Sequence, residues 1–339
     1  MNNIALIGYA CGMAASNPDC ALGPWSLYYT SGWLNKIHEN ASWEKIISAS
    51  SNYVGMHVLP EVTQQLKLLS QTVLSLSLQK KAFCVIGGDH SCGMGTWSGV
   101  ACAQREHGDI GLIWIDAHMD SHTLKTSTSK NIHGMPVAHL LGHGEPCLTQ
   151  LSELQPALKP ENLCLIGIRS YQPAEKELLQ RLGVRVFYIE DIRTHGVANI
   201  INQAVAHVSQ STCGFGVSID LDAIDPNDAP GVGNPEANGI PANALISSLN
   251  NLAGSYPSKF LGLEIAEYNP TADQNHKTAK ILTNLIHAVY QGSQAESTGL
   301  NDACDLNSTT RQIQSVVALS SPEQNADQIL VHAPNQQSI

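Results

Sequence analysis

The sequence predicts one α/β domain organised around a mainly parallel β-sheet. Short apolar runs recur along the chain, and they are continuous rather than alternating between apolar and polar residues. Runs of this kind are typical of strands that are buried on both faces of a parallel sheet. Longer segments with helical spacing separate the runs, and this strand–helix alternation is typical of α/β folds.

The strands are expected where the apolar runs end in glycine or in a cluster of polar residues. In chain order they are Ile4–Tyr9, Ala82–Ile86, Ile110–Ile115, Leu163–Ile168, Val184–Ile189, Gly214–Ile219 and Phe260–Ile265. Helical spacing is present between them, for example over Glu61–Gln79, Glu175–Leu182, Ile200–Val208, Ala242–Leu252 and Thr278–Tyr290. No linker or break in composition precedes residue 291, which predicts a single domain over residues 1–290. Residues 291–339 are rich in Gln, Asn, Ser, Thr and Asp, so we expect a polar C-terminal extension there, partly disordered or packed on the surface.

Composition and charge argue against several classes of protein. The chain has 339 residues, of which 43% are hydrophobic, and this is enough for one large domain with a true core. Its formal net charge is −11 and it has no Lys/Arg-rich run, which argues against nucleic-acid binding through a basic face. No apolar stretch approaches the roughly 18 residues that a membrane-spanning helix needs.

The cysteines and the N-terminal segment predict a reducing, cytoplasmic location. Nine cysteines are scattered without a C-x-x-C pair, which argues against a disulfide framework and against a zinc ribbon. The first apolar run has no positively charged segment before it, so we expect a strand there rather than a signal peptide.

Chemically active side chains follow the predicted strands, where open α/β sheets bind their ligands. A Gly-Gly-Asp-His-Ser run follows the second strand and contains His90. An Asp-x-His-x-Asp run follows the third strand, and if it stays extended, Asp116, His118 and Asp120 project to one side. An Asp-x-Asp run with the same spacing, at residues 220–222, follows another strand.

Together these residues predict a site for two divalent cations. Four converging aspartates would repel one another, and most would be protonated unless cations neutralised them. Two divalent ions balance four carboxylates, and His90 and His118 would complete the two shells, one on each ion. Oxygen-rich ligation with two imidazoles suits Mn²⁺ better than a structural zinc site, which would use thiolates. A single Asp-x-Asp pair is usually a capping or turn feature, so the joint occurrence of the three runs is what favours a metal site.

With these motifs the chain resembles the ureohydrolases, the family of arginase, agmatinase and formimidoylglutamase, over roughly residues 3–290. The matching segments are GGDHS at 87–91, DAHMD at 116–120, SIDLDAIDPNDAPG at 218–231 and EYNP at 267–270. The resemblance implies a three-layer α/β/α fold, two Mn²⁺ per subunit and a homotrimer or homohexamer. It implies that one ion is bound by His90, Asp116, Asp120 and Asp220, and that His118 and Asp222 complete the second ion, with some aspartates shared. Zinc deacetylases share this fold but need one metal only, and His90 beside a full set of aspartates favours two.

The resemblance also implies a mechanism for cleaving a guanidino group. A hydroxide between the two metals would attack the guanidinium carbon. Asp120 would take the proton from the bridging water and pass it to the leaving nitrogen, while Glu267 would pair with the guanidinium. His133 would shuttle protons to the departing amine, since a group that titrates near neutral pH suits that step. The alternative for a single histidine of this kind is a hydrogen-bonded loop residue.

The residues beyond the metal run predict how the rest of the substrate is held. Ser129 and Asn131 match residues with which arginases hold the α-carboxylate, whereas His122 replaces the usual asparagine. Gln172 stands where arginases place an aspartate near the substrate ammonium, and an amide can hydrogen-bond that group but cannot neutralise it. Glu175 follows on the same turn and could compensate.

The segment that leads to the Asn-x-His-Gly run favours arginase over agmatinase, so the expected reaction is hydrolysis of L-arginine to urea and ornithine. Agmatinase, guanidinobutyrase and formimidoylglutamase activities, on related guanidino or formimino substrates, are the alternatives within the class. A catalytically silent scaffold that binds partners through residues 291–339 is an alternative from another class. Every expected ligand is present, which argues against it.

Overall fold

The computed structural model describes residues 3–290, except residues 31, 34–36, 38–40, 50, 52, 54, 153 and 154. Its centre is a sheet of eight parallel strands in the order β2-β1-β3-β8-β7-β4-β5-β6. The strands are β1 (Ile4–Ala10), β2 (Ala41–Ser48), β3 (Ala82–Gly87), β4 (Ile110–Ile115), β5 (Leu163–Ile168), β6 (Arg185–Tyr188), β7 (Gly214–Asp220) and β8 (Phe260–Ala266). The predicted α/β class with a parallel sheet is confirmed.

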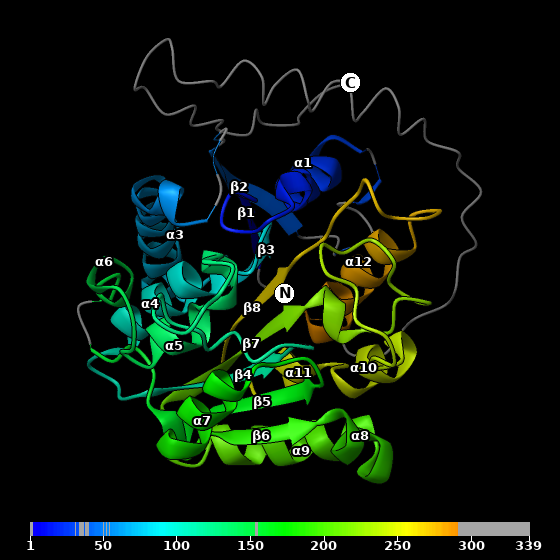
Figure 1. Cartoon of the computed structure of the whole chain (residues 1–339). Coiled ribbons are helices and arrows are strands. Elements are labelled where there is room, and N and C mark those ends of the chain that lie inside the picture. The colour runs from blue at the N-terminus through cyan, green and yellow to red at the C-terminus, as the bar shows by residue number, and fades with distance from the viewer. Residues whose placement is uncertain are drawn as a thin grey trace.

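Helices cover both faces of the sheet, which gives three layers (Figure 1). The helices are α1 (Leu22–Tyr29), α3 (Leu59–Leu78), α4 (Cys92–Gln104), α5 (Pro136–Leu140), α6 (Pro146–Thr149), α7 (Pro173–Leu182), α8 (Ile189–His195), α9 (Val197–Val208), α10 (Ala242–Ser248), α11 (Leu252–Ser255) and α12 (Lys277–Tyr290). Short 3-10 helices lie in the connections at η1 (Pro18–Ala21), η2 (Gly55–Val58), η3 (Ile132–Gly134), η4 (Pro160–Asn162) and η5 (Leu221–Ala223).

Side chains alternate between the two faces of each strand and form two cores. On β4, Leu112 and Trp114 belong to the core that α3 and α4 cover. Ile113 and Ile115 belong to the core that α9, α10 and α12 cover. Because both faces are covered, every residue of β4 is buried, and this explains why the strand is a continuous apolar run in the sequence.

Two strands differ from the sequence prediction. Strand β2 was not predicted, because it mixes Ser, Glu and Lys with apolar residues and is partly exposed at the edge of the sheet. Strand β6 is shorter than predicted, because helix α8 begins at Ile189. The side chain of Asp191 accepts a hydrogen bond from the backbone N–H of Tyr188, and this caps the helix.

Two helices differ as well. Helix α4 was not predicted, because it is buried almost all round and rich in glycine, so it lacks an amphipathic pattern. Its glycines let α3 approach closely: a Cβ on Gly99 would lie 2.5 Å from the carbonyl oxygen of Ser70. The helix predicted over Ala242–Leu252 is broken into α10 and α11, because Asn251 has a φ of 56°, which a right-handed helix cannot continue.

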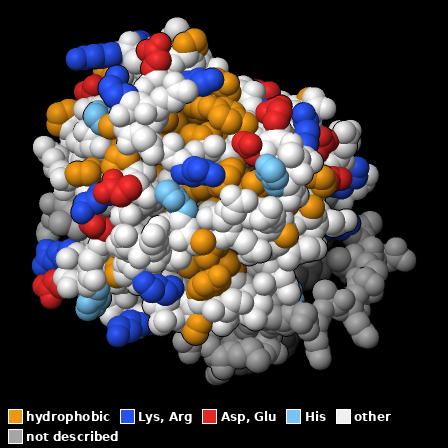
Figure 2. All heavy atoms as spheres, turned by 90° about the horizontal axis from the view of Figure 1, so that it is seen from below, with side chains coloured by type: hydrophobic (Ala, Val, Ile, Leu, Met, Phe, Trp, Pro, Cys, Tyr) orange, Lys and Arg blue, Asp and Glu red, His pale blue; other side chains and the backbone are white. Residues whose placement is uncertain are grey.

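Figure 2 shows the face on the β6 side, where Lys and Arg side chains are interspersed with Asp and Glu and with apolar patches. Within the described residues, no helix is both long enough and apolar enough to cross a membrane. The extension predicted over residues 291–339 lies outside the described residues.

Candidate metal centre

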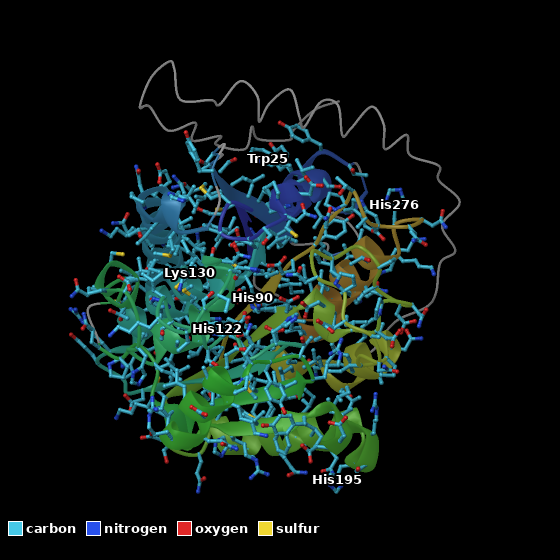
Figure 3. The ribbon with its side chains drawn as sticks, in the orientation of Figure 1. Trp25, His90, His122, Lys130, His195 and His276 are labelled. Carbon is cyan, nitrogen blue, oxygen red and sulfur yellow. The ribbon has the colours of Figure 1, made fainter. Side chains whose placement is uncertain are left out.

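Four neighbouring strands bring the predicted site residues to one edge of the sheet. Strands β3, β8, β7 and β4 lie side by side, and their carboxyl ends meet because they are parallel. His90 lies just after β3 and Asp116 just after β4. Asp220 is the last residue of β7, and Glu267 follows β8. In Figure 3 His90 lies near the centre of the molecule, whereas His195 lies at its periphery.

Three carboxylates converge on the ring of His90. Its Nδ1 atom lies 3.3 Å from Asp116 Oδ2, 3.3 Å from Asp120 Oδ2 and 3.1 Å from Asp220 Oδ2. All four side chains are buried. His90 Nδ1 and Asp120 Oδ2 have no hydrogen-bond partner among the described residues. Buried polar atoms are almost always satisfied, so two such atoms that face one point fit a site for a cation.

A second group of ligand-type atoms surrounds His118. Its Nδ1 atom lies 3.0 Å from Asp222 Oδ2 and 3.4 Å from Asp116 Oδ1. Asp116 therefore faces both histidines, one with each carboxylate oxygen. The other ring nitrogen of His118 lies 3.5 Å from Glu236 Oε1, and its side chain is 27% exposed. This second group consequently lies nearer to solvent than the first.

The donor set fits divalent cations. The ligand-type atoms of His90, Asp116 and Asp120 lie within 4.8 Å of one another, and so do those of Asp116, His118 and Asp222. Each group offers one imidazole and several carboxylate oxygens, a set that suits Mn²⁺ and related ions. A cation in the first group would also satisfy the two unpartnered atoms. The residues present can therefore hold two cations that share Asp116.

The candidate ligands are held in place by further contacts. The ring of His90 stacks on Trp114 with a centroid distance of 4.1 Å, and its Nε2 lies 2.9 Å from Ser218 Oγ. The indole N–H of Trp114 donates to Asp116 Oδ2 at 2.9 Å. Such contacts fix the orientation of a ligand and favour one tautomer of a histidine.

The closely spaced aspartates lie in turns and not in an extended strand. Strand β4 ends at Ile115, and Asp120 has a φ of 46°, so the expectation of an extended Asp-x-His-x-Asp run is wrong. Asp116 Oδ1 accepts the backbone N–H of His118 at 2.7 Å. Asp220 Oδ1 accepts the backbone N–H of Asp222 at 2.8 Å in the same way. Each aspartate thus closes a tight turn that brings the second ligand beside the first.

The carboxylates repel one another when no cation is present. Burial, followed by the charge of Asp116, raises the pKa of Asp120 to about 7. Burial, together with the charges of Asp222 and Asp116, raises the pKa of Asp220 well above its ordinary value. Burial alone would lower the pKa of His118, but the charge of Asp222 and hydrogen bonds to both aspartates raise it strongly. The cluster therefore takes up protons where cations would supply positive charge.

Glu267 and His133 form a buried pair beside the two groups. Glu267 Oε1 lies 3.1 Å from His133 Nδ1 and accepts the backbone N–H of His90 at 2.9 Å. Burial would raise the pKa of Glu267, but the hydrogen bond and charge of His133 lower it. Burial would lower the pKa of His133, but the contact with Glu267 and nearby carboxylates raises it to about 9. The pair is therefore charged at neutral pH. Glu267 has a φ of 68°, in the left-handed region.

The five predicted substrate-contacting residues lie on two neighbouring segments. His122 Nε2 lies 3.3 Å from Glu175 Oε2, and the Glu175 carboxylate also accepts the backbone N–H groups of Ser121 and Gln172. Gln172 is exposed, at the start of α7. Ser129 is exposed and Asn131 half-buried; the amide of Asn131 donates to Ser16 Oγ at 2.6 Å. The Glu175 carboxylate therefore accepts two backbone N–H groups and lies beside the ring of His122.

Sequence reasoning missed several residues of the site. Trp114 and Ser218 lie within strands, where an apolar or small residue gives no sign of a contact to His90. Glu236 lies in a loop after β7, and no spacing connects it with His118. Cys20, in η1, contacts Glu267 Oε2 through its Sγ atom at 3.1 Å. It is 247 positions away in sequence, so no local motif could reveal this contact.

Comparisons with known proteins agree on one family. A model described as the arginase family matches residues 2–291. The arginase of Brevibacillus brevis is 39% identical over 232 residues, which cover 68% of this chain and 76% of that protein. The arginase of Agrobacterium fabrum is 30% identical over 300 residues, covering 84% of this chain and 90% of that protein. The solved structure of the Bacillus caldovelox arginase matches with a TM-score of 0.79 and 30% identity, over 87% of this chain and 100% of that chain.

Proposed function

The chain belongs to the arginase family, and we propose that it hydrolyses the guanidino C–N bond of L-arginine to give urea and ornithine. One observation carries this proposal: two groups of ligand-type atoms share Asp116 and lie beside the buried carboxylate of Glu267. A pair of cations beside a fixed negative charge suits a planar, positively charged substrate that water must attack.

The proposed ligands follow from the two groups. His90, Asp116, Asp120 and Asp220 hold one Mn²⁺, and His118, Asp116, Asp220 and Asp222 hold the other, with Asp220 shared in part. When bound, the two ions supply Lewis acidity and an activated water for hydrolysis. The close contacts of His90 Nδ1 with three carboxylates, and the two unpartnered atoms there, support this assignment.

The side chains around the ions have separate proposed roles. Glu267 receives the guanidinium through a charge-assisted hydrogen bond and so orients the carbon that is attacked. Asp120 accepts the proton of the attacking water at its carboxylate and passes it to the leaving nitrogen. His133, whose pKa is raised to about 9 by Glu267 against the effect of burial, carries a proton at neutral pH. It can therefore shuttle a proton to the departing amine.

The other end of the substrate is assigned to His122, Ser129, Asn131, Gln172 and Glu175. The pairing of His122 with Glu175 and the neutral side chain of Gln172 favour a second candidate, a guanidino or formimino compound with a different tail. Agmatine, guanidinobutyrate and formimidoylglutamate are such compounds. We further propose a cytoplasmic homotrimer or homohexamer.

A substrate panel on Mn²⁺-loaded protein tests the proposal. We expect urea from L-arginine and little from agmatine or guanidinobutyrate. Urea from agmatine but not from L-arginine would reject the proposed substrate while keeping the reaction class. Two bound metal ions without turnover of any guanidino or formimino compound would instead favour the silent scaffold.

A further inference from the structure

We propose that Cys20 is a positioning residue for Glu267, whose carboxylate it holds by an S–H···O hydrogen bond in the orientation that receives the guanidinium. This inference rests on the proposed function, because that is where Glu267 is assigned to the guanidinium. Cys20 Sγ lies 3.1 Å from Glu267 Oε2, and both side chains are buried. The thiol comes from η1, near the start of the chain, and the carboxylate follows the last strand.

The carboxylate of Glu267 is held from three segments. Oε1 faces two donors, the backbone N–H of His90 at 2.9 Å and the ring Nδ1 of His133 at 3.1 Å. Oε2 faces the thiol of Cys20 at 3.1 Å, and the backbone oxygen of Glu267 is a more distant acceptor of the same thiol at 3.7 Å. A carboxylate oxygen accepts about two hydrogen bonds, so Oε1 is filled in this state and Oε2 retains one position. Cys20 therefore determines which side of Oε2 is left open to a substrate N–H.

Neighbouring residues pack closely around the contact between Cys20 and Glu267. A Cβ on Gly233 would lie 3.0 Å from Glu267 Oε2 and 3.2 Å from Cys20 Sγ. The backbone of Glu267 is in the left-handed region, and its N–H donates to the carbonyl oxygen of Gly88 at 2.8 Å. Left-handed geometry at a residue other than glycine persists only when its surroundings hold it. The backbone thus fixes where the side chain starts, and the thiol fixes one of its two oxygens.

A thiol suits this position because it donates without adding charge. Burial, and then the charge of Glu267, raise the pKa of Cys20 well above its ordinary value, so the sulfur keeps its proton. A thiol is a weak donor, so it orients Oε2 while leaving the negative charge of Glu267 available. A lysine or arginine here would neutralise that charge and compete with the guanidinium for the same oxygen.

Three variants separate the donor from its volume. Cys20→Ala removes both, Cys20→Val fills and slightly exceeds the volume without a donor, and Cys20→Ser keeps a donor. The Mn²⁺-loaded proteins are compared by kcat and KM for L-arginine and by inhibition with guanidinium ion, which carries only the group that Glu267 would bind. For Ala and Val we expect KM and the guanidinium inhibition constant to rise about three- to tenfold, with a smaller change in kcat. Ser should restore both to within about twofold.

Metal content and a matched control exclude indirect effects. Bound Mn²⁺ should stay unchanged in all three variants, because the thiol of Cys20 contacts Glu267, which is not one of the proposed ligands. Cys164→Ala removes another buried thiol, on β5, whose Sγ lies 4.0 Å from a neighbouring carbonyl oxygen. It should leave the guanidinium inhibition constant at the wild-type value, so a rise equal to that of Cys20→Ala would overturn the proposal.

The other outcomes of this experiment also support or reject the role of Cys20. Unchanged constants in Ala and Val, or equal losses in Ser and Ala, would show that the thiol does not act as a donor. If Cys20→Val does not fold, the comparison of Ala with Ser decides alone. If the wild-type protein neither cleaves a guanidino compound nor is inhibited by guanidinium, the proposed function fails first. If the wild type is active and only the variants behave unexpectedly, the role of Cys20 alone is rejected.

Discussion

The two ends of the candidate site are built in different ways. At the metal end, His90, Asp116 and Asp220 come from the ends of neighbouring strands, are buried, and are held by further contacts. At the other end, His122 and Gln172 lie on partly exposed segments, and His122 pairs with Glu175. Strand ends are fixed by the sheet, whereas loops can change their contacts at little cost to stability. We therefore expect the reaction class to depend on the strand ends and the choice of substrate to depend on the loops around them.

Asp116→Asn tests the metal end most severely, because Asp116 faces both histidines. Loss of an outer contact to a metal ligand typically costs about 10–100-fold, so loss of a shared ligand should cost more than about 100-fold in urea production. Bound Mn²⁺, measured by mass spectrometry, should fall below two per chain. Asp109→Asn, at an exposed position that pairs with Lys159, is the control and should keep both. An Asp116→Asn protein with two tightly bound ions would contradict the ligand assignment.

Glu267→Gln separates binding of the guanidinium from binding of the metal. The amide keeps the size of the side chain but loses the charge, and hydrogen bonds to charged groups contribute about 1.5–3 kcal/mol. We expect kcat/KM for L-arginine to fall about 10–100-fold. Metal content should remain that of the wild type. A variant that loses its metal instead would show that Glu267 belongs to the metal end and not to the substrate.

His133→Asn gives a pH-dependent effect in the metal-free protein. Contact with Glu267 raises the pKa of His133 from 6.5 to about 9 despite burial. Because the folded-state pKa is the higher one, the pair stabilises the fold fully below pH 6.5 and loses this contribution as pH rises through about 9. The variant should be less stable by about 1–2 kcal/mol at pH 6, and the difference should shrink by pH 10. Denaturant titrations at several pH values measure it, and a constant difference would argue against a charged pair.

Gln172→Asp is expected to give the smallest effect, at the exposed end. A carboxylate at position 172 would give a substrate ammonium group a negatively charged partner, but water screens this attraction strongly. We expect kcat/KM for L-arginine to rise about threefold relative to guanidinobutyrate, which has no ammonium group. Gln180→Asp, on the exposed side of the same helix, should leave the ratio unchanged. Equal gains in both variants would indicate general attraction rather than a contact with the substrate.

Much of the fold and the metal end could be predicted, because each left a local pattern. Strand β4 is buried on both faces, so its sequence is a continuous apolar run, and Asp116 follows directly. In an extended strand, the i, i+2 spacing would place these side chains on one side. In the structure the spaced residues lie instead in turns that the aspartates themselves close. Strand β2 and helix α4 could not be predicted, because an edge strand and a helix buried almost all round lack the usual periodicity of apolar residues. The contact of Cys20 could not be predicted, because its partner Glu267 is distant in sequence.

The backbone conformation of Asp120 and Glu267 affects the stability of the fold. Both residues have left-handed φ angles, 46° and 68°, which glycine adopts freely and other residues adopt at a cost of about 1–3 kcal/mol each. A change of Asp120 to glycine would remove that strain and a buried carboxylate together, whereas at Glu267 it would also remove the partner of His133. At Asp120, the stability of the metal-free fold and the proposed turnover are therefore expected to oppose each other.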